Sequence, residues 1–389
     1  MGEVYRAKGT KLKRGVAQII FLAILGLLAG FAGGQSRLIF PRLSFETGTL
    51  TGIAVLNPNG TSALVTFIGY DDTGQVIEAA GFENRREITI EAGRQLAEVV
   101  AALFGTGPAD TVGWIEATST SSNLTGFFLY LNLPDFTFFD GADLPPTDTQ
   151  LVFPEVRLAG GFSTELNVVN PGSQAAIVQL TLQGGEKSYM ADLLVIPARG
   201  VRRLDVAEAF AGILPAGVGV LPDPAIVSLD STQPLAGFAF VRQPEGDLLG
   251  LNAVPAEERL NLLYFPQLAV GESIRTELSL DNLSREDTLL TLTAHQKDGE
   301  LFGSGDITSN PVSLPLGAGQ VLRLDISDTF GFVGADLRDG WLEVASTSQA
   351  LHGALSYTLP TSKLLANPSG TGTDVPSPGT AGDKKHPTC

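Results

Sequence analysis

Residues 40–58 read FPRLSFETGTLTGIAVLNP, residues 153–171 read FPEVRLAGGFSTELNVVNP, and residues 265–283 read FPQLAVGESIRTELSLDNL. Each stretch opens on Phe-Pro and places an Asn 17 residues after the Phe, at Asn57, Asn170 and Asn282. The Phe-Pro pairs stand 113 and 112 residues apart. Such a fixed spacing is typical of a repeated structural unit. The chain therefore holds three copies of one unit, and each residue can be compared with its counterparts.

The segments on either side of each Asn alternate between apolar and polar side chains. This period of two predicts half-buried strands. Asn57-Pro58-Asn59-Gly60 and Asn170-Pro171-Gly172 supply turn residues between the two strands. The side chains expected to point inward are Ile53/Val55, Leu166/Val168 and Leu278/Leu280 before the Asn, and Val65/Phe67, Val178/Leu180 and Leu290/Leu292 after it.

Each copy continues with a hairpin-like turn and a glycine turn, and then a short segment that ends in Phe. The glycine turns are expected at Ala92-Gly93, Arg199-Gly200 and Ala318-Gly319. Residues 95–104 place four apolar side chains on one helical face, which predicts a short helix. The equivalent segments 201–210 and 321–330 look like a strand followed by one helical turn.

Two further strands close each unit, one of them Trp114-Ile115-Glu116 in the first copy and Trp341-Leu342-Glu343 in the third. About seven short strands per unit, separated by frequent turns, indicate an all-β fold of antiparallel β-sandwiches. Brief linkers at 145–150 and 255–261 suggest units that follow one another end to end like beads. The expected division is 1–34 signal peptide or membrane anchor, 35–147 repeat 1, 148–258 repeat 2, 259–362 repeat 3, and 363–389 disordered tail.

These motifs resemble the tandem immunoglobulin-like β-sandwich repeats of secreted bacterial proteins, mostly of unknown function. The resemblance covers residues 38–362 and rests on the strand before the Asn, the Asn-Pro turn, the glycine turn and the Trp-containing strand. It implies an extracytoplasmic structural or binding role and assigns no catalytic residue. The Cys pair of antibody-type domains is absent, since the one Cys is Cys389.

The N-terminus carries an export signal. Five Lys and Arg residues fall within residues 1–15, and an apolar run from Val16 to Ala32 follows and ends in small residues. This order predicts a cleaved secretory signal peptide. An uncleaved membrane anchor and a pilin-type leader cut after Gly15 remain alternatives. Each reading places the repeats outside the cytoplasm, in secreted, periplasmic or surface-exposed form.

Charge and composition exclude several functions. The net charge of −17 disfavours binding to a phosphate backbone, so nucleic acid is not an expected partner. His295, His352 and His386 show no spacing suited to a metal site or a catalytic triad. Asp72-Thr73-Gly74 resembles the aspartic-protease motif, but the chain has no second copy, and we interpret it as a surface turn. The sequence thus predicts no enzyme and no cofactor.

Calcium stays open as an alternative because Asp71, Asp72, Asp140 and Asp143 lie in turns or loops of an acidic protein. The other candidate site is aromatic. Strand and loop residues near the end of repeat 1 form a cluster that the other repeats lack, and it could serve as a ligand surface or as packing between repeats. Its members are Phe128, Tyr130, Phe136, Phe138 and Phe139.

The expected function is a non-enzymatic structural, adhesive or interaction protein at the cell exterior, with a protein or glycan as its partner. One alternative is a carbohydrate-binding accessory protein that uses the aromatic residues of repeat 1. Another is a subunit of an extracellular filament. Contact with a membrane is expected only through the N-terminal segment.

Overall fold

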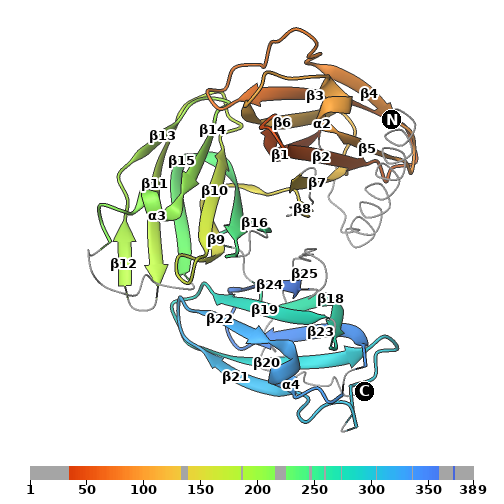
Figure 1. Ribbon diagram of the computed structural model, residues 1–389, viewed down its shortest axis with the longest axis vertical. Helices are drawn as coiled ribbons and strands as arrows, with labels where there is room; N and C mark the ends of the chain where they lie inside the picture. Colours follow the sequence, from red (N-terminus) through yellow and green to blue (C-terminus); the bar gives the residue numbers. More distant parts are fainter. Residues whose placement is uncertain are drawn as a thin grey trace, which may run out of the picture.

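The computed structural model describes residues 35–132, 139–184, 187–214, 225–244, 248–257, 260–272, 274–303, 305–334, 336–358 and 371–372. The expected signal or anchor segment lies outside these residues, and so does the expected disordered tail apart from its two-residue strand β25 (Thr371–Gly372). Within the described part, no helix is long and apolar enough to cross a bilayer. The fold is all-β with several antiparallel sheets, and repeat 2 lies between repeats 1 and 3 along an arc (Figure 1).

Repeat 1 consists of two four-stranded sheets that enclose a common core. Buried side chains of both sheets, such as Phe67 and Ile53, face each other in this core. The first sheet has the order β1 (Ser36–Ser44), β6 (Val112–Ser119), β3 (Ala63–Asp71), β4 (Arg86–Ile90), and the second has the order β5 (Gln95–Val99), β2 (Thr49–Leu56), β7 (Thr125–Asn132), β8 (Phe139–Asp143).

Repeat 3 follows the same plan with a five-stranded and a three-stranded sheet. Its core again lies between the two sheets. The larger sheet has the order β21 (Val312–Leu316), β20 (Thr288–Gln296), β23 (Arg338–Ser346), β18 (Leu262–Val270), β25, and the smaller has the order β22 (Val321–Asp325), β19 (Arg275–Asn282), β24 (Leu351–Thr358).

Repeat 2 differs because its two closing strands form one long strand, β15 (Ala225–Arg242). The first half of β15 pairs with β11 and the second half with β10, so all strands join in one nine-stranded sheet. The remaining strands are β9 (Thr147–Val156), β10 (Ser163–Val169), β11 (Ala176–Gly184), β12 (Lys187–Met190), β13 (Leu194–Ile196), β14 (Val201–Asp205), β16 (Leu248–Asn252) and β17 (Val254–Pro255).

The alternation predicted around each Asn is confirmed. Every inward candidate before and after the Asn is at most 3% exposed, and the landmark residues Phe40, Phe153 and Phe265 are fully buried. Burial of one such side chain contributes about 1.5–3 kcal/mol, so the recurring apolar positions account for the three cores.

The three landmark Asn residues are fully buried and form the same hydrogen bonds. The Nδ2 group of each donates to the carbonyl four residues later at 2.8 Å. It also donates to the last carbonyl of β4, β13 or β21, at 2.9, 3.2 and 3.3 Å. The Oδ1 atom accepts from the backbone N–H two residues later. The Asn thus links two loops of each repeat and satisfies buried carbonyls, so its recurrence is structural.

The helix predicted at residues 95–104 was wrong in its first half. Residues 95–99 form strand β5 because they pair with β2, and only Val100–Phe104 form helix α2. The matching helices are α3 (Val206–Ala209) and α4 (Ile326–Phe330), capped by Asp205 and Asp325. In repeat 2 the left-handed residue of the glycine turn is Arg199 (φ 59°), which stands where the other repeats have Gly93 and Gly319 (both φ 64°).

The repeats do not follow one another as separate beads. The expected linker at 145–150 runs into strand β9, and Phe238 and Phe240 of β15 belong to the buried cluster of repeat 1. A further buried cluster joins Trp114 and Tyr70 of repeat 1 to Val201 of repeat 2. Apolar faces outside each core therefore cover one another between repeats.

Candidate functional site

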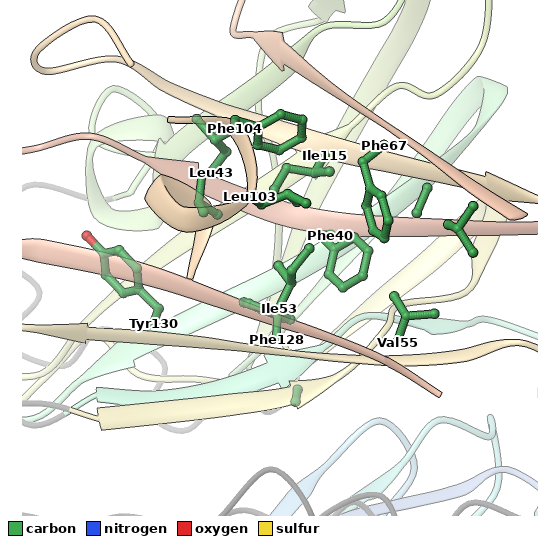
Figure 2. Close-up of a cluster of buried hydrophobic side chains, with 14 of the residues drawn as sticks. Phe40, Leu43, Ile53, Val55, Phe67, Leu103, Phe104, Ile115, Phe128 and Tyr130 are labelled. Carbon is green, nitrogen blue, oxygen red and sulfur yellow. The ribbon is translucent and has the colours of Figure 1, made fainter. Parts of the chain in front are cut away.

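Two of the five predicted aromatic residues lie at the boundary of repeats 1 and 2. Phe128 is fully buried, and its ring meets Phe238 edge to face at 4.8 Å between centroids. Tyr130 is 5% exposed, and its ring lies 5.1 Å from that of Phe240. Figure 2 shows both side chains among the core residues of repeat 1. A sugar could stack on either ring only if the repeats separated.

The other three aromatic residues give less information. Phe136 and Phe138 lie outside the described residues. Phe139 begins β8, where its backbone pairs with Leu131, and its side chain is outside the described part. These three side chains therefore lie outside the described part of the chain.

The acidic candidates have separate structural roles. Asp71 Oδ1 accepts hydrogen bonds from the Thr73 and Gln75 N–H groups, both at 2.9 Å, and so stabilises its own turn. Asp143 accepts from Asn252 Nδ2 of repeat 2 at 2.9 Å, and burial raises the pKa of its carboxyl group. The side chain of Asp140 lies outside the described part. No group of three or more His, Cys, Asp or Glu side chains converges among the described residues.

The Asp72-Thr73-Gly74 turn is a contact between repeats. The Asp72 carbonyl accepts from the Val201 N–H at 3.1 Å. Gly74 has a φ of +90°, and a Cβ built there would lie 2.0 Å from the Ala198 carbonyl oxygen. The motif that resembles a protease signature therefore serves to let two backbones approach closely.

The main polar cluster of this boundary surrounds Trp114 and Glu116. The indole Nε1 of the fully buried Trp114 donates to the Arg199 carbonyl at 2.6 Å, and its ring stacks on Tyr70 at 4.9 Å. Arg199 Nη1 lies 3.0 Å from both carboxylate oxygens of Glu116, and Arg37 Nε donates to the same carboxylate at 2.6 Å. Each charge buried here is paired, as low-dielectric surroundings require.

A second polar cluster surrounds Arg42, whose side chain is 4% exposed. Its guanidinium donates to Glu165 Oε1 at 3.0 Å and to Asn167 Oδ1 at 3.1 Å in repeat 2, and to Glu46 Oε2 at 3.0 Å in repeat 1. It also lies 5.0 Å from the centre of the Tyr130 ring. Burial by itself would raise the pKa of Glu46, but Arg42, Ser44 and Arg203 outweigh it and keep this pKa below its usual value.

Repeats 2 and 3 meet through the equivalent faces. Val152 and Ile226, counterparts of Ile39 and Trp114, pack with Val321 of repeat 3. Arg323 Nε pairs with the buried Glu155 at 3.0 Å. Glu155 follows Phe153-Pro154 just as Arg42 follows Phe40-Pro41, so the same position carries a buried charge at both boundaries.

An open groove of about 950 Å³ lies beside the first boundary, with Asp71, Asp110, Ile77, Val201, Arg202 and Arg203 in its lining. Its described lining combines carboxylates and guanidinium groups but includes no His, Ser or Cys that could act as a nucleophile with a base. The groove can hold water and charged groups.

The described histidines are separate from each other. His295 stacks on Trp341 at 3.8 Å with an interplanar angle of 2°, and its Nδ1 lies 3.2 Å from the Gly299 carbonyl. His352 pairs through its backbone with Asp281 on the adjacent strand β19. His386 lies outside the described residues.

No protein-family model and no curated protein matches the chain. Two solved structures are similar to parts of it. A protein from Thermotoga maritima has 14% identity and a TM-score of 0.23, over 28% of this chain and 93% of that chain. A structure of infectious bursal disease virus, Gx strain, has 10% identity and a TM-score of 0.15, over 86% of this chain and 74% of that chain. At these scores neither likeness supports a function.

Proposed function

We propose that this protein is a non-enzymatic structural and interaction protein at the cell exterior, built from three immunoglobulin-like β-sandwiches held in a fixed order. The observation that supports it most is the use of its polar side chains. Trp114, Glu116 and Arg199 bind one another across a boundary between repeats, and Arg42 and Glu165 do the same. These buried polar and charged side chains thus stabilise the contact between repeats 1 and 2.

Paired buried charges and stacked rings fix the angle between two sandwiches more firmly than a flexible linker does. A stiff array of this kind presents its outer faces at set distances from its point of attachment. The predicted export segment at residues 1–34 would place such an array outside the cytoplasm. This combination suits a surface scaffold or adhesive module whose partner is a protein or a glycan.

The test combines localisation with a search for activity. Protease applied to intact cells should cleave the repeats, and a tagged chain should capture partners from the cell exterior without altering them. Turnover of a hydrolase substrate by the purified protein, abolished by one side-chain substitution, would overturn the proposal. Full protection from external protease, together with a soluble intracellular chain, would overturn its location.

A further inference from the structure

The two boundaries between repeats follow one rule. The face that carries Tyr70, Trp114 and Glu116 in repeat 1, here called the acceptor surface, receives a turn of the next repeat, here called the docking turn. The docking turns are Pro197–Gly200 of repeat 2 and 317–320 of repeat 3. The counterpart of Tyr70 in repeat 2 is Gln183, and a Cβ on Gly319 would lie 2.4 Å from Gln183 Nε2. At both boundaries, the left-handed residue of the docking turn therefore lies beside the same position of the acceptor surface: Arg199 beside Tyr70, and Gly319 beside Gln183.

Repeat 3 retains an acceptor surface of the repeat 1 type. Trp341 and Glu343 stand where repeat 1 has Trp114 and Glu116, and His295 stacks on Trp341 as Tyr70 stacks on Trp114. Tyr264, the counterpart of Ile39, adds a third ring 6.0 Å from Trp341. Burial raises the pKa of the Tyr264 phenol, and the neighbouring Glu343 carboxylate raises it further.

Within the described residues, the acceptor surface of repeat 3 is less buried than its counterparts, and strand β25 pairs with Leu263 and Tyr264 at its edge. Trp114 is fully buried, whereas Trp341 is half-buried. Arg42 and Glu155 are buried, whereas their counterpart Gln267 is exposed.

The turn beside this surface is open as well. Gly74 and Gly299 share a φ of +90°, yet a Cβ on Gly74 would strike repeat 2 and a Cβ on Gly299 would meet nothing within 4 Å. No hydrogen bond to the Trp341 indole N–H occurs within the described residues, although Trp114 has the Arg199 carbonyl.

An exposed aromatic surface of this kind is unfavourable in water. Faces of repeat units that contact no further unit are normally polar, which keeps the array soluble. Repeat 3 instead presents a tryptophan, a tyrosine and a histidine around one carboxylate. Aromatic side chains gathered around a charged group favour an interface that another surface covers.

Repeat 1 also has a docking turn, and within the described residues this turn is exposed and contacts no acceptor surface. Residues 91–94 are exposed, and Gly93 has the left-handed conformation (φ 64°) of Arg199 and Gly319. The Gly93 carbonyl corresponds to the Arg199 carbonyl that binds Trp114. Arg94 follows it directly and offers a guanidinium, the group that pairs with Glu116 at the first boundary.

We propose that two copies of this chain associate head to tail, with the docking turn of repeat 1 in one copy on the acceptor surface of repeat 3 in the other. The Gly93 carbonyl accepts from the Trp341 indole, Arg94 pairs with Glu343, and the half-buried Leu56 packs against the rings as Val169 does at the first boundary. Because the two surfaces differ, the contact leaves one of each free and continues into an open chain or a ring.

The first experiment is sedimentation of the full chain over a range of concentrations, in a Cys389→Ser background that removes disulfide cross-linking. The average mass should rise with concentration. Glu343→Arg and Arg94→Glu should each weaken association about tenfold or more, and the mixture of the two variants should restore it because the charges are complementary again. Leu289→Ala, which changes an exposed residue on another part of the same sheet, should have no effect.

The second experiment locates the contact. Arg94→Cys and His295→Cys are made separately in the Cys389→Ser background and mixed under oxidising conditions. A cross-linked dimer should form in the mixture and should be lost when Leu289→Cys replaces His295→Cys.

A chain that stays monomeric at every concentration would overturn the inference and leave the proposed function untouched. A further variant, His295→Cys with Cys389 retained, tests the chain's own C-terminal segment: an internal disulfide between the two would show that this segment covers the surface. If a monomer binds a glycan and the Trp341→Ala variant does not, the surface is a sugar site. Either result would also overturn it.

Discussion

Single residues at the boundaries between repeats depart from the common pattern of the repeats. Arg199 occupies a left-handed position that glycine holds in the other repeats, and its guanidinium pairs with Glu116. The left-handed region costs a non-glycine residue about 1–2 kcal/mol. This strain persists because the residue provides both the carbonyl that binds Trp114 and the charge that neutralises Glu116.

Substitutions at Arg199 should separate these two effects. Arg199→Ala loses the ion pair and keeps the strain, whereas Arg199→Gly loses the ion pair and relieves the strain. We expect both variants to be less stable than the native chain, and the Ala variant to be lower than the Gly variant by about 1 kcal/mol in urea unfolding. Arg85 has the same conformation (φ 62°) and is exposed, so Arg85→Gly should instead stabilise the protein. An Arg199→Gly variant more stable than the native chain would show that the ion pair contributes less than the strain that glycine relieves.

Asp281 supplies a pH-dependent test at the second boundary. Complete burial, with the Glu155 carboxylate nearby, raises the pKa of Asp281 well above its usual value, and Arg323 is the cation on Glu155. Above about pH 4 the unfolded chain has released this proton while the folded chain retains it, so the contribution of Asp281 to stability falls as the pH rises.

Asp281→Asn removes this ionisation at little change in shape. The variant should therefore melt at a higher temperature than the native chain at pH 7–8, and the difference should shrink toward zero near about pH 4. Thermal unfolding followed by circular dichroism across this range provides the measurement. An equal difference at all pH values would contradict an effect of ionisation.

At the scale of turns and strands, equivalent elements have acquired different neighbours. The turns after β3 and β20 end in Gly74 and Gly299 with the same φ of +90°, but only Gly74 touches another repeat. The Phe-Pro strands show the same contrast, since the residue after Pro is buried in repeats 1 and 2 and exposed in repeat 3. Local sequence sets the shape of each element, and the following repeat determines whether it is covered.

The two glycines form a matched pair for mutagenesis. Gly299→Ala should cost about 1–2 kcal/mol, the strain of a left-handed alanine. Gly74→Ala should cost more because its Cβ would overlap the Ala198 carbonyl, and it should also expose the boundary of repeats 1 and 2 to limited proteolysis. Equal unfolding free energies and equal cleavage patterns would show that the Gly74 contact does not hold the repeats together.

At the scale of the whole molecule, repeats 1 and 2 share part of their apolar core. Phe238 and Phe240 extend from the outer face of β15 into the cluster that contains Phe40 and Phe128. A shared core of this kind couples the unfolding of the two repeats. Repeats 1 and 2 should therefore unfold in one joint transition. Acidification should loosen this boundary, because the low pKa of Glu46 contributes stability only while the carboxyl stays ionised.

Phe240→Ala and Phe210→Ala should distinguish the core that repeats 1 and 2 share from the core that belongs to repeat 2 alone. Each substitution should cost about 3–5 kcal/mol, since both side chains are at most 4% exposed. Phe210 lies in the core of repeat 2 alone, whereas Phe240 packs on Tyr130 of repeat 1. In calorimetry, Phe240→Ala should split the joint transition of repeats 1 and 2, and Phe210→Ala should lower it intact. A single transition in both variants would contradict the coupling.

The sequence by itself determined the repeat, the inward positions and the turns, because these depend on period-two alternation and on short turn motifs. It could not show that Gln95–Val99 is a strand, since the same apolar spacing also suits a helix and only pairing with β2 decides. The tertiary structure decided that Phe238 and Phe240 meet Phe128 and Tyr130, that Arg199 stands where the other repeats have a glycine, and that Trp341 is half-buried where Trp114 is fully buried. The physical reason is the distance along the chain. These features depend on whether a residue of another repeat lies against a given side chain, and no local sequence pattern records which distant face that will be.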